Sequence, residues 1–343
     1  MKNIIINIAI FFLIASSFFL WYEIINNEYQ KEIITGKEIF RDNISIKVFF
    51  CPKDNCEEIL KNKIENSKFI SCAFYDLGLE SIIEALEETN SKIIIDRDYE
   101  HKIKNRNLNY ITDNSNRYMH NKFCIFDNKT VFTGSMNPTN NDANINANNI
   151  VFIDSKKIAE NYLEKFNRMF YDNEFKRRNG ELPKYQIVKD RKNNITLKTL
   201  FCPESRCEDN VINVLTKANE SIYFMHFSFT SLEIGNLLIE KLNENIEVKG
   251  IFENWLNSNS QWSRYGILNE ESKQDFILSR PPGKMHHKVF IIDEKIIITG
   301  SYNPSNNGNL NNDENIVIIY NEGIAKLYKE EFDYLWVKYE KNI

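Results

Sequence analysis

The chain has 343 residues, with 42% hydrophobic and 27% charged side chains and a formal net charge of −5. This composition excludes an intrinsically disordered protein, and the length predicts one large or two smaller folded domains. The negative balance argues against a general nucleic-acid binder, because affinity for a phosphate backbone comes from clustered Lys and Arg, although a local basic cleft can lie on an acidic protein.

Taken in chain order, the first element is an uncharged apolar segment at residues 4–22. Its length is close to the roughly 20 residues that span a bilayer, and it ends on Trp21 and Tyr22, which are typical of a membrane interface. We interpret residues 1–25 as an uncleaved signal anchor, a transmembrane helix that binds the phospholipid bilayer through residues 4–25. A linker at residues 26–44 follows it.

The charges around this segment predict its orientation. Lys2 precedes it and Glu23 follows it, so the positive-inside bias places the N-terminus in the cytoplasm and the catalytic part of this single-pass protein outside. Two alternatives stay open. The small residues at 15–17 allow a cleaved signal peptide and a secreted protein, and a buried core helix would also be apolar.

Four of the six cysteines form two matching pairs, FCPKDNCEE with Cys51 and Cys56, and FCPESRCED with Cys202 and Cys207. In an oxidising compartment this spacing predicts two short-loop disulfides. The alternative is one zinc site made of all four thiolates. The other two cysteines lie in the apolar runs FISCAFY and KFCIF, so we expect both to be buried, inert thiols.

The paired cysteines mark an internal duplication. After each pair, an amphipathic helix, an apolar strand, a second helix and another strand follow in the same order. Strands that alternate with helices predict an α/β architecture with a largely parallel sheet in each half. We place the first half at residues 45–185 and the second at 186–343, divided at a stretch that contains Pro and Lys.

The second half has gained 15 residues within the segment NWLNSNSQWSRYGILNEESKQDFILSRPPGK. The offset between equivalent residues is therefore 151 at the cysteines and 166 from the repeated histidine onward. This segment is rich in Trp, Tyr, Ser and Asn, so it is either a loop that lines a substrate mouth or a neutral surface insertion.

The most specific repeat is MHNKFCIFDNKTVFTGSMNP at residues 119–138, which returns as MHHKVFIIDEKIIITGSYNP at residues 285–304. In each copy His-x-Lys begins a strand, and the alternation of a strand places His and Lys on one face. A turn leads to a second strand that ends in Gly-Ser-x-Asn, which brings a hydroxyl and an amide to the same end. Lys, Ser and Asn are donors suited to a phosphate, and a histidine can attack phosphorus or protonate a leaving oxygen.

Each half has one motif histidine, whereas a displacement needs a nucleophile and an acid. Two copies related by approximate two-fold symmetry supply both. One histidine and one aspartate per half is poor chemistry for a divalent metal, so we expect a site without a metal or another cofactor.

The pattern His-x-Lys, four residues, Asp, six residues, Gly-Ser-x-Asn resembles the signature of the phospholipase D superfamily, the HKD motif, and it occurs twice. The resemblance implies two duplicated α/β/α sandwich halves with pseudo-two-fold symmetry and one metal-independent site, complete within one chain and without an obligate protein partner. It also implies a phosphoric diester hydrolase with a covalent phosphohistidine intermediate.

The matching residues are catalytic candidates, and the lysines and asparagines among them are also candidates for binding the substrate phosphate. They are His120, Lys122, Asp127, Gly134, Ser135 and Asn137 in the first half and His286, Lys288, Asp293, Gly300, Ser301 and Asn303 in the second. For Asp127 and Asp293 a structural role is the alternative to a catalytic one.

Members of this family usually have an acidic residue after the motif that hydrogen-bonds the catalytic histidine. The second half has it at Glu314, whereas the equivalent position in the first half is Asn148. A carboxylate raises the pKa of a histidine. We therefore predict His286, paired with Glu314, as the general acid, and His120 as the neutral nucleophile.

Two alternatives stay open for the first half: Asp142 or Asp127 supplies the missing charge, or this half is impaired. Outside the motifs, we expect His226 to be a core histidine, with a place in the site as the alternative. We expect His287 to point away from the face of its neighbours.

Three substrate classes fit this chemistry. Phospholipid hydrolysis is favoured, because the anchor brings the site within reach of lipid head groups. An endonuclease is the alternative, since compact anchored members of the superfamily include cardiolipin hydrolase-like and nuclease-like proteins. A cardiolipin synthase-type phosphatidyltransferase fits a single span and a short chain less well.

A nuclease would need a basic rim, but the candidate cations alternate with Glu and Asn, as on a solvated face. These cations are Lys61, Lys63, Lys68, Arg97, Lys102, Lys104 and Arg106.

Overall fold

The computed structural model describes residues 38–113, 117–176, 182–192, 194–258 and 260–341. The chain divides into a short N-terminal unit that ends at Phe40 and a compact unit, Arg41–Ile343. The predicted signal anchor (1–25) and most of the predicted linker lie outside the described residues. In the part of the chain that is described, no helix is both long and apolar enough to cross a membrane.

The first half of the compact unit contains a seven-stranded sheet with the order β2-β8-β7-β6-β3-β4-β5. Its strands are β2 (Ser45–Cys51), β3 (Ile70–Phe74), β4 (Ser91–Ile95), β5 (Tyr110–Thr112), β6 (Lys122–Phe126), β7 (Thr130–Gly134) and β8 (Asn148–Asp154). Its helices are α2 (Cys56–Glu65), α3 (Glu80–Glu87), the 3₁₀ turn η1 (Arg97–Lys102), α4 (Asn140–Asn144) and α5 (Lys156–Asp172).

The second half contains a sheet with the order β9-β10-β16-β15-β14-β11-β12-β13. The strands are β9 (Ile187–Asp190), β10 (Thr196–Cys202), β11 (Ser221–His226), β12 (Glu247–Phe252), β13 (Phe276–Leu278), β14 (Lys288–Ile292), β15 (Ile296–Gly300) and β16 (Glu314–Tyr320). The helices are α6 (Cys207–Leu215), α7 (Leu232–Asn243), α8 (Asn254–Asn257), α9 (Tyr265–Glu271), α10 (Asn306–Leu310) and α11 (Glu322–Lys341). The strand β1 (Ile39–Asp42) reaches this sheet at Asp42, whose carbonyl accepts a hydrogen bond of 3.0 Å from the backbone N–H of Arg191.

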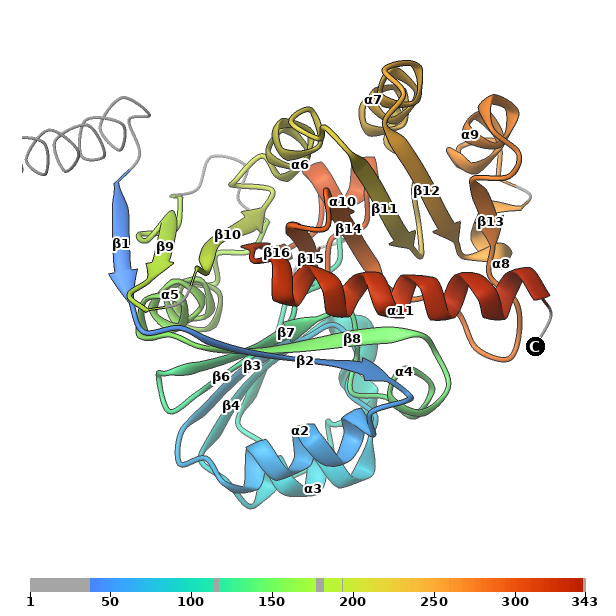
Figure 1. Ribbon diagram of the computed structural model, residues 1–343. Coiled ribbons are helices and arrows are strands. Elements are labelled where there is room, and N and C mark those ends of the chain that lie inside the picture. Colours follow the sequence, from blue (N-terminus) through green and yellow to red (C-terminus); the bar gives the residue numbers. More distant parts are fainter. Residues whose placement is uncertain (1–37, 114–116, 177–181, 193, 259, 342–343) are drawn as a thin grey trace, which may run out of the picture. The chain divides into compact units, whose positions relative to one another are not determined.

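The two halves pack as alternating layers. Helices α2 and α3 bury their apolar residues against the outer face of the first sheet, and α6 and α7 do the same on the second (Figure 1). The long helices α5 and α11 cover the inner faces, and each also contacts a strand of the other half, α5 with β10 and α11 with β2. The predicted α/β sandwich architecture with two sheets is therefore confirmed.

The prediction of largely parallel sheets is wrong. Strands β3, β4 and β5 are parallel, as are β11, β12 and β13, but every other pair within the two sheets is antiparallel. The reason lies in the connections. Strands β6 and β7 are joined by a tight turn in which Asp127 and Asn128 both have positive φ, as in a type I′ turn, and such a turn can only reverse the chain.

All six cysteines form disulfides. The predicted pairs Cys51–Cys56 and Cys202–Cys207 are confirmed, so the zinc alternative is wrong. The expectation of two inert thiols is also wrong, because Cys72 and Cys124 form a third disulfide with a Cα–Cα distance of 4.1 Å. These two residues lie directly opposite each other on β3 and β6, a register that their separation of 52 residues does not reveal.

Buried asparagines join the halves reciprocally. The Asn149 side-chain amide donates to Thr299 Oγ1 and to the Tyr328 hydroxyl, both at 2.9 Å. Its counterpart Asn315 donates to Thr133 Oγ1 at 2.5 Å and to the Tyr162 hydroxyl at 3.3 Å.

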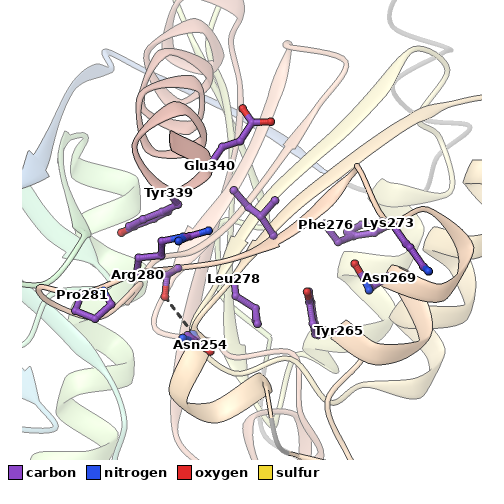
Figure 2. A pocket seen from close by; sticks show the side chains of 12 residues that line it. Asn254, Tyr265, Asn269, Lys273, Phe276, Leu278, Arg280, Pro281, Tyr339 and Glu340 are labelled. Carbon is purple, nitrogen blue, oxygen red and sulfur yellow. Dashed lines mark hydrogen bonds between the residues drawn. The ribbon is translucent and has the colours of Figure 1, made fainter. Parts of the chain in front are cut away.

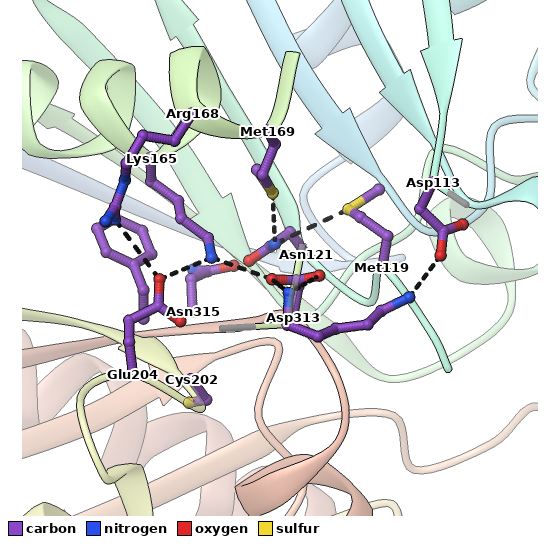
Figure 3. Close-up of polar contacts among 12 residues, drawn as sticks. Asp113, Met119, Asn121, Lys165, Arg168, Met169, Cys202, Glu204, Asp313 and Asn315 are labelled. Atoms are coloured by element: carbon purple, nitrogen blue, oxygen red, sulfur yellow. Dashed lines mark hydrogen bonds and ion pairs between the residues drawn. The ribbon is translucent and has the colours of Figure 1, made fainter. Parts of the chain in front are cut away.

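A buried ionic cluster closes the same interface on one side (Figure 3). The Lys165 ammonium of α5 lies 2.7 Å from Glu204 Oε1 and 3.0 Å from Asp313 Oδ1, and all three side chains are buried. Burial alone would lower the pKa of Lys165, but Asp313 and Glu204 raise it, so the ammonium is retained. At the equivalent place on the other side the charges are inverted, and Glu331 of α11 binds Lys53 at 2.8 Å.

Replacing Lys165 with Met should therefore lower the free energy of unfolding by about 3–5 kcal/mol, because it removes the cation bound to the buried Asp313 and leaves Glu204 with only the Arg168 guanidinium, 3.6 Å away. Unfolding in urea measures this change. Lys295→Met is the control, since its ion pair with Glu220 is exposed, and it should leave the unfolding midpoint nearly unchanged. Equal stability of the two variants would contradict the interpretation.

Candidate active site

A cavity of about 550 Å³ lies between the halves, and both motif histidines line it. The other lining residues are Tyr75, Asp76, Tyr99, Tyr118, Asn137, Thr139, Asn141, Asp142, Asn146, Phe227, Ser228, Leu256, Lys284, Asn303, Ser305, Asn307 and Asn312. The predicted convergence of two half-sites is thus present in the geometry of one chain.

His120 lies just before β6, and its position is fixed by the other half. Its backbone N–H donates to the carbonyl of Asp313 at 2.9 Å, and its Nδ1 lies 2.7 Å from Glu314 Oε2. The Tyr75 ring packs edge-on against the imidazole at 4.8 Å. With Nδ1 engaged by a carboxylate, Nε2 is the ring nitrogen left for a substrate.

His286 is held in the same way from the first half, but by a different group. Its backbone N–H donates to the carbonyl of Ala147 at 2.8 Å, and its Nδ1 lies 2.9 Å from Asn148 Oδ1. Asp142 Oδ2 is 3.3 Å from the same nitrogen. Phe227 takes the place of Tyr75, with its ring 4.8 Å from the imidazole.

The predicted pairing of Glu314 with His286 is therefore wrong, because each histidine is held by the opposite half. Asp313 forms a backbone bridge with Met119, next to His120, so the residue after Asp313 reaches the histidine of the first half. The alternative in which Asp142 supplies a charge near His286 agrees with the geometry, whereas Asp127 does not contact either histidine.

Lys122 and Lys288 are buried beneath the histidines. Each ammonium donates to the backbone carbonyl of the histidine two residues earlier, at 2.9 Å from Lys122 and 2.7 Å from Lys288. Burial lowers the pKa of Lys122 to about 8, although Glu314 and Asp142 oppose the shift. Burial and the neighbouring Lys122 ammonium lower the pKa of Lys288. An anion in the cavity would relieve this repulsion, so the pair suits a phosphate.

The two motif serines orient other side chains and do not line the cavity. Ser135 Oγ donates to Asn148 Oδ1 at 2.9 Å, and Ser301 Oγ donates to Glu314 Oε2 at 2.6 Å. The prediction that they donate to a phosphate therefore does not agree with the geometry. Instead, they hold Asn148 and Glu314, the residues that bind the two motif histidines. Gly134 and Gly300, which precede them, have φ near +140°, and a Cβ there would lie 2.3 Å and 2.2 Å from a backbone carbonyl oxygen.

Asn137 and Asn303 do line the cavity. Asn137 donates to Asp142 Oδ2 through its side-chain amide at 2.7 Å, and Asn303 Oδ1 accepts from the backbone N–H of Ser228 at 3.4 Å. Both therefore remain candidates for contact with a substrate.

Asp127 and Asp293, predicted as catalytic residues with a structural role as the alternative, do not reach the site, and the geometry agrees with the structural role. They lie in the turns after β6 and β14, at the opposite ends of those strands from Lys122 and Lys288. A strand of five residues spans roughly 16 Å. Asp127 accepts from the backbone N–H groups of Lys68 and Phe69 at 2.8 and 3.0 Å, and Asp293 holds Ser221 in the same way. Both aspartates fix a turn and a neighbouring strand.

Sequence reasoning missed several lining residues. Asn146 and Asn312 are repeated at the offset of 166 residues, so the duplication itself could have indicated them. Tyr75 and Phe227 follow equivalent strands, β3 and β11, but their side chains differ, so the repeat carried no signal for them.

The two remaining buried histidines serve the core and the interface. His226 packs among aromatic rings, with Phe290 at 4.5 Å, and within the described part of the chain neither of its ring nitrogens has a partner. Burial lowers its pKa well below the usual range, so it is neutral. His287 points away from the cavity, as expected, with Nδ1 3.2 Å from Asn149 Oδ1.

The inserted segment of the second half contributes Leu256 and Lys284 to the cavity. The Lys284 ammonium lies 5.1 Å from the ring of Trp255, which is 72% exposed. A second hollow, of about 600 Å³, lies at the outer edge of β13, and Arg280 and Tyr339 are among the residues that line it (Figure 2). This second hollow contains neither motif histidine, so we do not assign it to the reaction.

Burial lowers the pKa of both motif histidines to about 4, against the opposing effect of Glu314 on His120 and of Asp142 on His286. Both imidazoles are therefore neutral at pH 7. Among the described residues, no group of three or more His, Cys, Asp or Glu side chains is arranged to hold a metal ion. The two imidazoles line the cavity, and the two lysine ammonium groups lie behind its lining, each bound to the backbone carbonyl of a motif histidine.

Comparison with known proteins agrees with this geometry. The family model described as "Cardiolipin synthase, PLD-like domain" matches residues 44–170 and 211–336. The phospholipase D of Rickettsia conorii is 30% identical over 136 residues, which are 40% of this chain and 67% of the relative. The phospholipase D of Rickettsia prowazekii is 27% identical over 167 residues, 49% of this chain and 80% of the relative. Each of these alignments is about as long as one half of the duplicated chain.

Two further similarities are more distant. Human mitochondrial cardiolipin hydrolase is 28% identical over 130 residues, 38% of this chain and 50% of that protein. The crystal structure of a phosphatidylserine synthase from Haemophilus influenzae aligns with a TM-score of 0.65 at 12% identity, over 85% of this chain and 86% of the other. The latter similarity shows a shared fold across both halves.

The pKa of Lys122 makes anion binding dependent on pH. Because the ammonium is charged below its pKa of about 8, the affinity of the cavity for sulfate should fall by up to about tenfold per pH unit above pH 8. Calorimetric titration with sulfate between pH 6 and 10 measures this, since sulfate keeps its charge over that range. Lys122→Met should bind sulfate more weakly at pH 7, and an affinity of the parent that stays constant up to pH 10 would contradict the assignment.

Proposed function

This chain belongs to the phospholipase D superfamily, and on that premise we propose that it is a metal-independent phosphodiesterase that hydrolyses phospholipids through a phosphohistidine intermediate. Its relatives support phosphodiester hydrolysis as the reaction class. One observation carries the mechanism: both imidazoles line one cavity, and each is held through Nδ1 by the opposite half, which leaves Nε2 for the substrate.

His120 is the proposed nucleophile. It is neutral at pH 7, and its Nδ1–H donates to the Glu314 carboxylate. Nε2 attacks phosphorus, a bond to nitrogen forms, and the ring gains positive charge, which Glu314 stabilises as the aspartate does in a serine protease triad. Glu314 thus belongs to the proposed nucleophile and not, as the sequence suggested, to the acid.

His286 is the proposed general acid. The anionic diester raises its pKa on binding, so that Nε2 carries a proton. As the bond from phosphorus to the leaving oxygen breaks, this proton passes to that oxygen and an alcohol departs. In the second step His286 accepts a proton from water, the water oxygen bonds to phosphorus, and the bond to His120 breaks.

The lysines and asparagines stabilise the charge on phosphorus. Lys122 and Lys288 supply two ammonium groups fixed by backbone carbonyls, so they need no rearrangement when negative charge builds up on the phosphoryl oxygens. Asn137 and Asn303 line the cavity from the two halves and donate to the same oxygens.

Phospholipid is the favoured substrate because of the aromatic and charged groups in the cavity wall. Tyr75, Tyr99, Tyr118 and Phe227 contribute four aromatic rings to a wall that is otherwise mostly polar, and Asp76 adds a negative charge that Lys102 neutralises at 2.6 Å. Two of the candidate cations for a nucleic-acid rim are also engaged with acids, Lys61 with Glu65 and Arg106 with Glu80 and Glu87. These ion pairs reduce the free positive charge that is left for binding a phosphate backbone.

An endonuclease remains the second candidate, because Lys284 and the exposed Trp255 lie together at the mouth of the cavity and would suit a stacked base beside a phosphate. A transferase would use an alcohol in place of water in the second step, and the same residues serve it.

We further propose that the catalytic part lies outside the cytoplasm on a single-pass membrane anchor, with secretion after cleavage as the alternative. Three disulfides in the described part of the chain support an oxidising compartment. The site draws its residues from both halves of one chain, so no partner protein is required.

The roles of the histidines can be separated by trapping the intermediate. His120→Asn should form no phosphoenzyme, because the attacking nitrogen is lost, whereas His286→Asn should accumulate it with a diester that has a good leaving group. Acid-quenched samples with a ³²P-labelled diester measure the label on the protein. Label on His120→Asn would overturn the assignment.

The substrate can be tested on the full chain with chelator present throughout. Vesicles of mixed phospholipids should release head groups, and labelled single-stranded DNA should stay intact. Cleavage of DNA alone would establish the nuclease instead, and a requirement for added metal would refute the mechanism. His120→Asn serves as the inactive control for both substrates.

A further inference from the structure

The two halves carry their acidic residue at different positions. The second half has Glu314 after its motif, and Gly308 lies six residues before Glu314. In the first half the acidic residue is at the other position: Asn148 is equivalent to Glu314, and Asp142 lies six residues before Asn148. Since positions 142 and 308 are equivalent, as are 148 and 314, each half keeps one carboxylate at one of the two places.

We propose that Asp142 is the positioning residue of His286 and carries the charge that Asn148 lacks. The inference rests on the proposed function, because it concerns how the general acid is held. The first half therefore still provides a charged partner for a histidine, at a different position in the sequence.

The geometry places Asp142 beside the imidazole. Its Oδ2 lies 3.3 Å from His286 Nδ1, and only 4% of the residue is exposed. The carboxylate is itself held in place: Oδ2 accepts from the Asn137 backbone N–H at 2.9 Å and from its side-chain amide at 2.7 Å, and Oδ1 accepts from Asn146 at 2.7 Å. A buried carboxylate with this many donors has a fixed orientation.

Asn148 completes the arrangement as a neutral spacer. Its amide donates to the backbone carbonyl of Asp142 at 2.9 Å, so its Oδ1 is turned toward His286 Nδ1 and Ser135 Oγ. The imidazole N–H is thus shared between an amide oxygen and a carboxylate oxygen. In the second half Glu314 alone supplies both functions, to His120 and to Ser301.

The second half could not use the same solution. A Cβ at Gly308 would lie 2.4 Å from the backbone oxygen of Asn303, so a side chain at this position would force the backbone apart. The first half accommodates Asp142 in the equivalent turn of α4. The two positions are therefore alternative places for one carboxylate per half.

Charge balance in the buried site gives the same assignment. The groups that face His286 are Asp142 from α4, Lys288 from its own strand and Lys122 from β6. Without Asp142, the two ammonium groups would have Glu314 as their nearest buried anion, on the side of His120. His286 would then be surrounded by positive charge, which disfavours the imidazolium that a general acid requires.

The test uses full-length variants and two soluble diesters, methyl phenyl phosphate and methyl 4-nitrophenyl phosphate. Phenolate is the poorer leaving group, so it needs protonation by His286, whereas 4-nitrophenolate does not. Asp142→Asn keeps the shape of the side chain and removes its charge. In the first turnover, before the phosphoenzyme is hydrolysed, it should lower the rate of phenol release by about 100-fold and change the rate of 4-nitrophenol release by less than about threefold.

Moving the carboxylate should restore the reaction. The double variant Asp142→Gly with Asn148→Glu copies the second half into the first, and it should recover the phenyl ester rate to within about fivefold of the parent, whereas Asp142→Gly alone should not. The alkaline limb of kcat should shift to lower pH in Asp142→Asn and return in the double variant, because loss of the carboxylate lowers the pKa of the bound imidazolium.

Outcomes that contradict the proposal are distinct from failure of the proposed function. Equal losses on both esters in Asp142→Asn, or no recovery in a double variant that unfolds at the parent temperature, would make Asp142 a structural residue only. A parent protein that hydrolyses neither ester would instead remove the proposed function itself.

Discussion

The hydrogen bond between His120 and Glu314 is the contact on which the rest of the site depends. It is 2.7 Å long, its Glu314 side chain is fully buried, and it joins the first half to the second. Because a carboxylate buried without its partner costs several kcal/mol, the halves cannot separate at this point without a large penalty. The backbone bridge of Met119 with Asp313 and the hydrogen bonds of Asn149 and Asn315 repeat the same exchange around it.

This crossed arrangement also places carboxylates near the two buried lysines. Lys122 and Lys288 are buried close together and each donates to the carbonyl of its own histidine. Two carboxylates, Glu314 and Asp142, face them from opposite halves, and an anionic substrate adds the third negative group. A bound phosphodiester would therefore reduce the repulsion between the two ammonium groups, which ties substrate binding to the electrostatics of the fold.

Duplication gave the chain two equal half-sites, and later divergence made them unequal. At the interface the ion pair of Lys165 with Glu204 is matched by one of opposite sense between Glu331 and Lys53. A first half paired with a copy of itself would place Lys165 opposite Lys53, so the inversion favours pairing of the first half with the second. Within the site, Asp142 and Glu314 differ in position but both hold an imidazole through Nδ1.

The sequence by itself determined the family, the duplication, the short-loop disulfides and most of the residues that meet in the cavity, because these depend on local spacing kept twice along the chain. His120 and Lys122 lie on one strand at a separation of two, and a strand fixes their common face. Only the tertiary structure decided which partner each histidine has, that Asp127 and Asp293 lie far from the site, and that Cys72 meets Cys124. Those outcomes depend on which strands are neighbours in a sheet and on how the two halves pack against each other. Both are contacts between residues far apart in the chain, and no local sequence pattern indicates them.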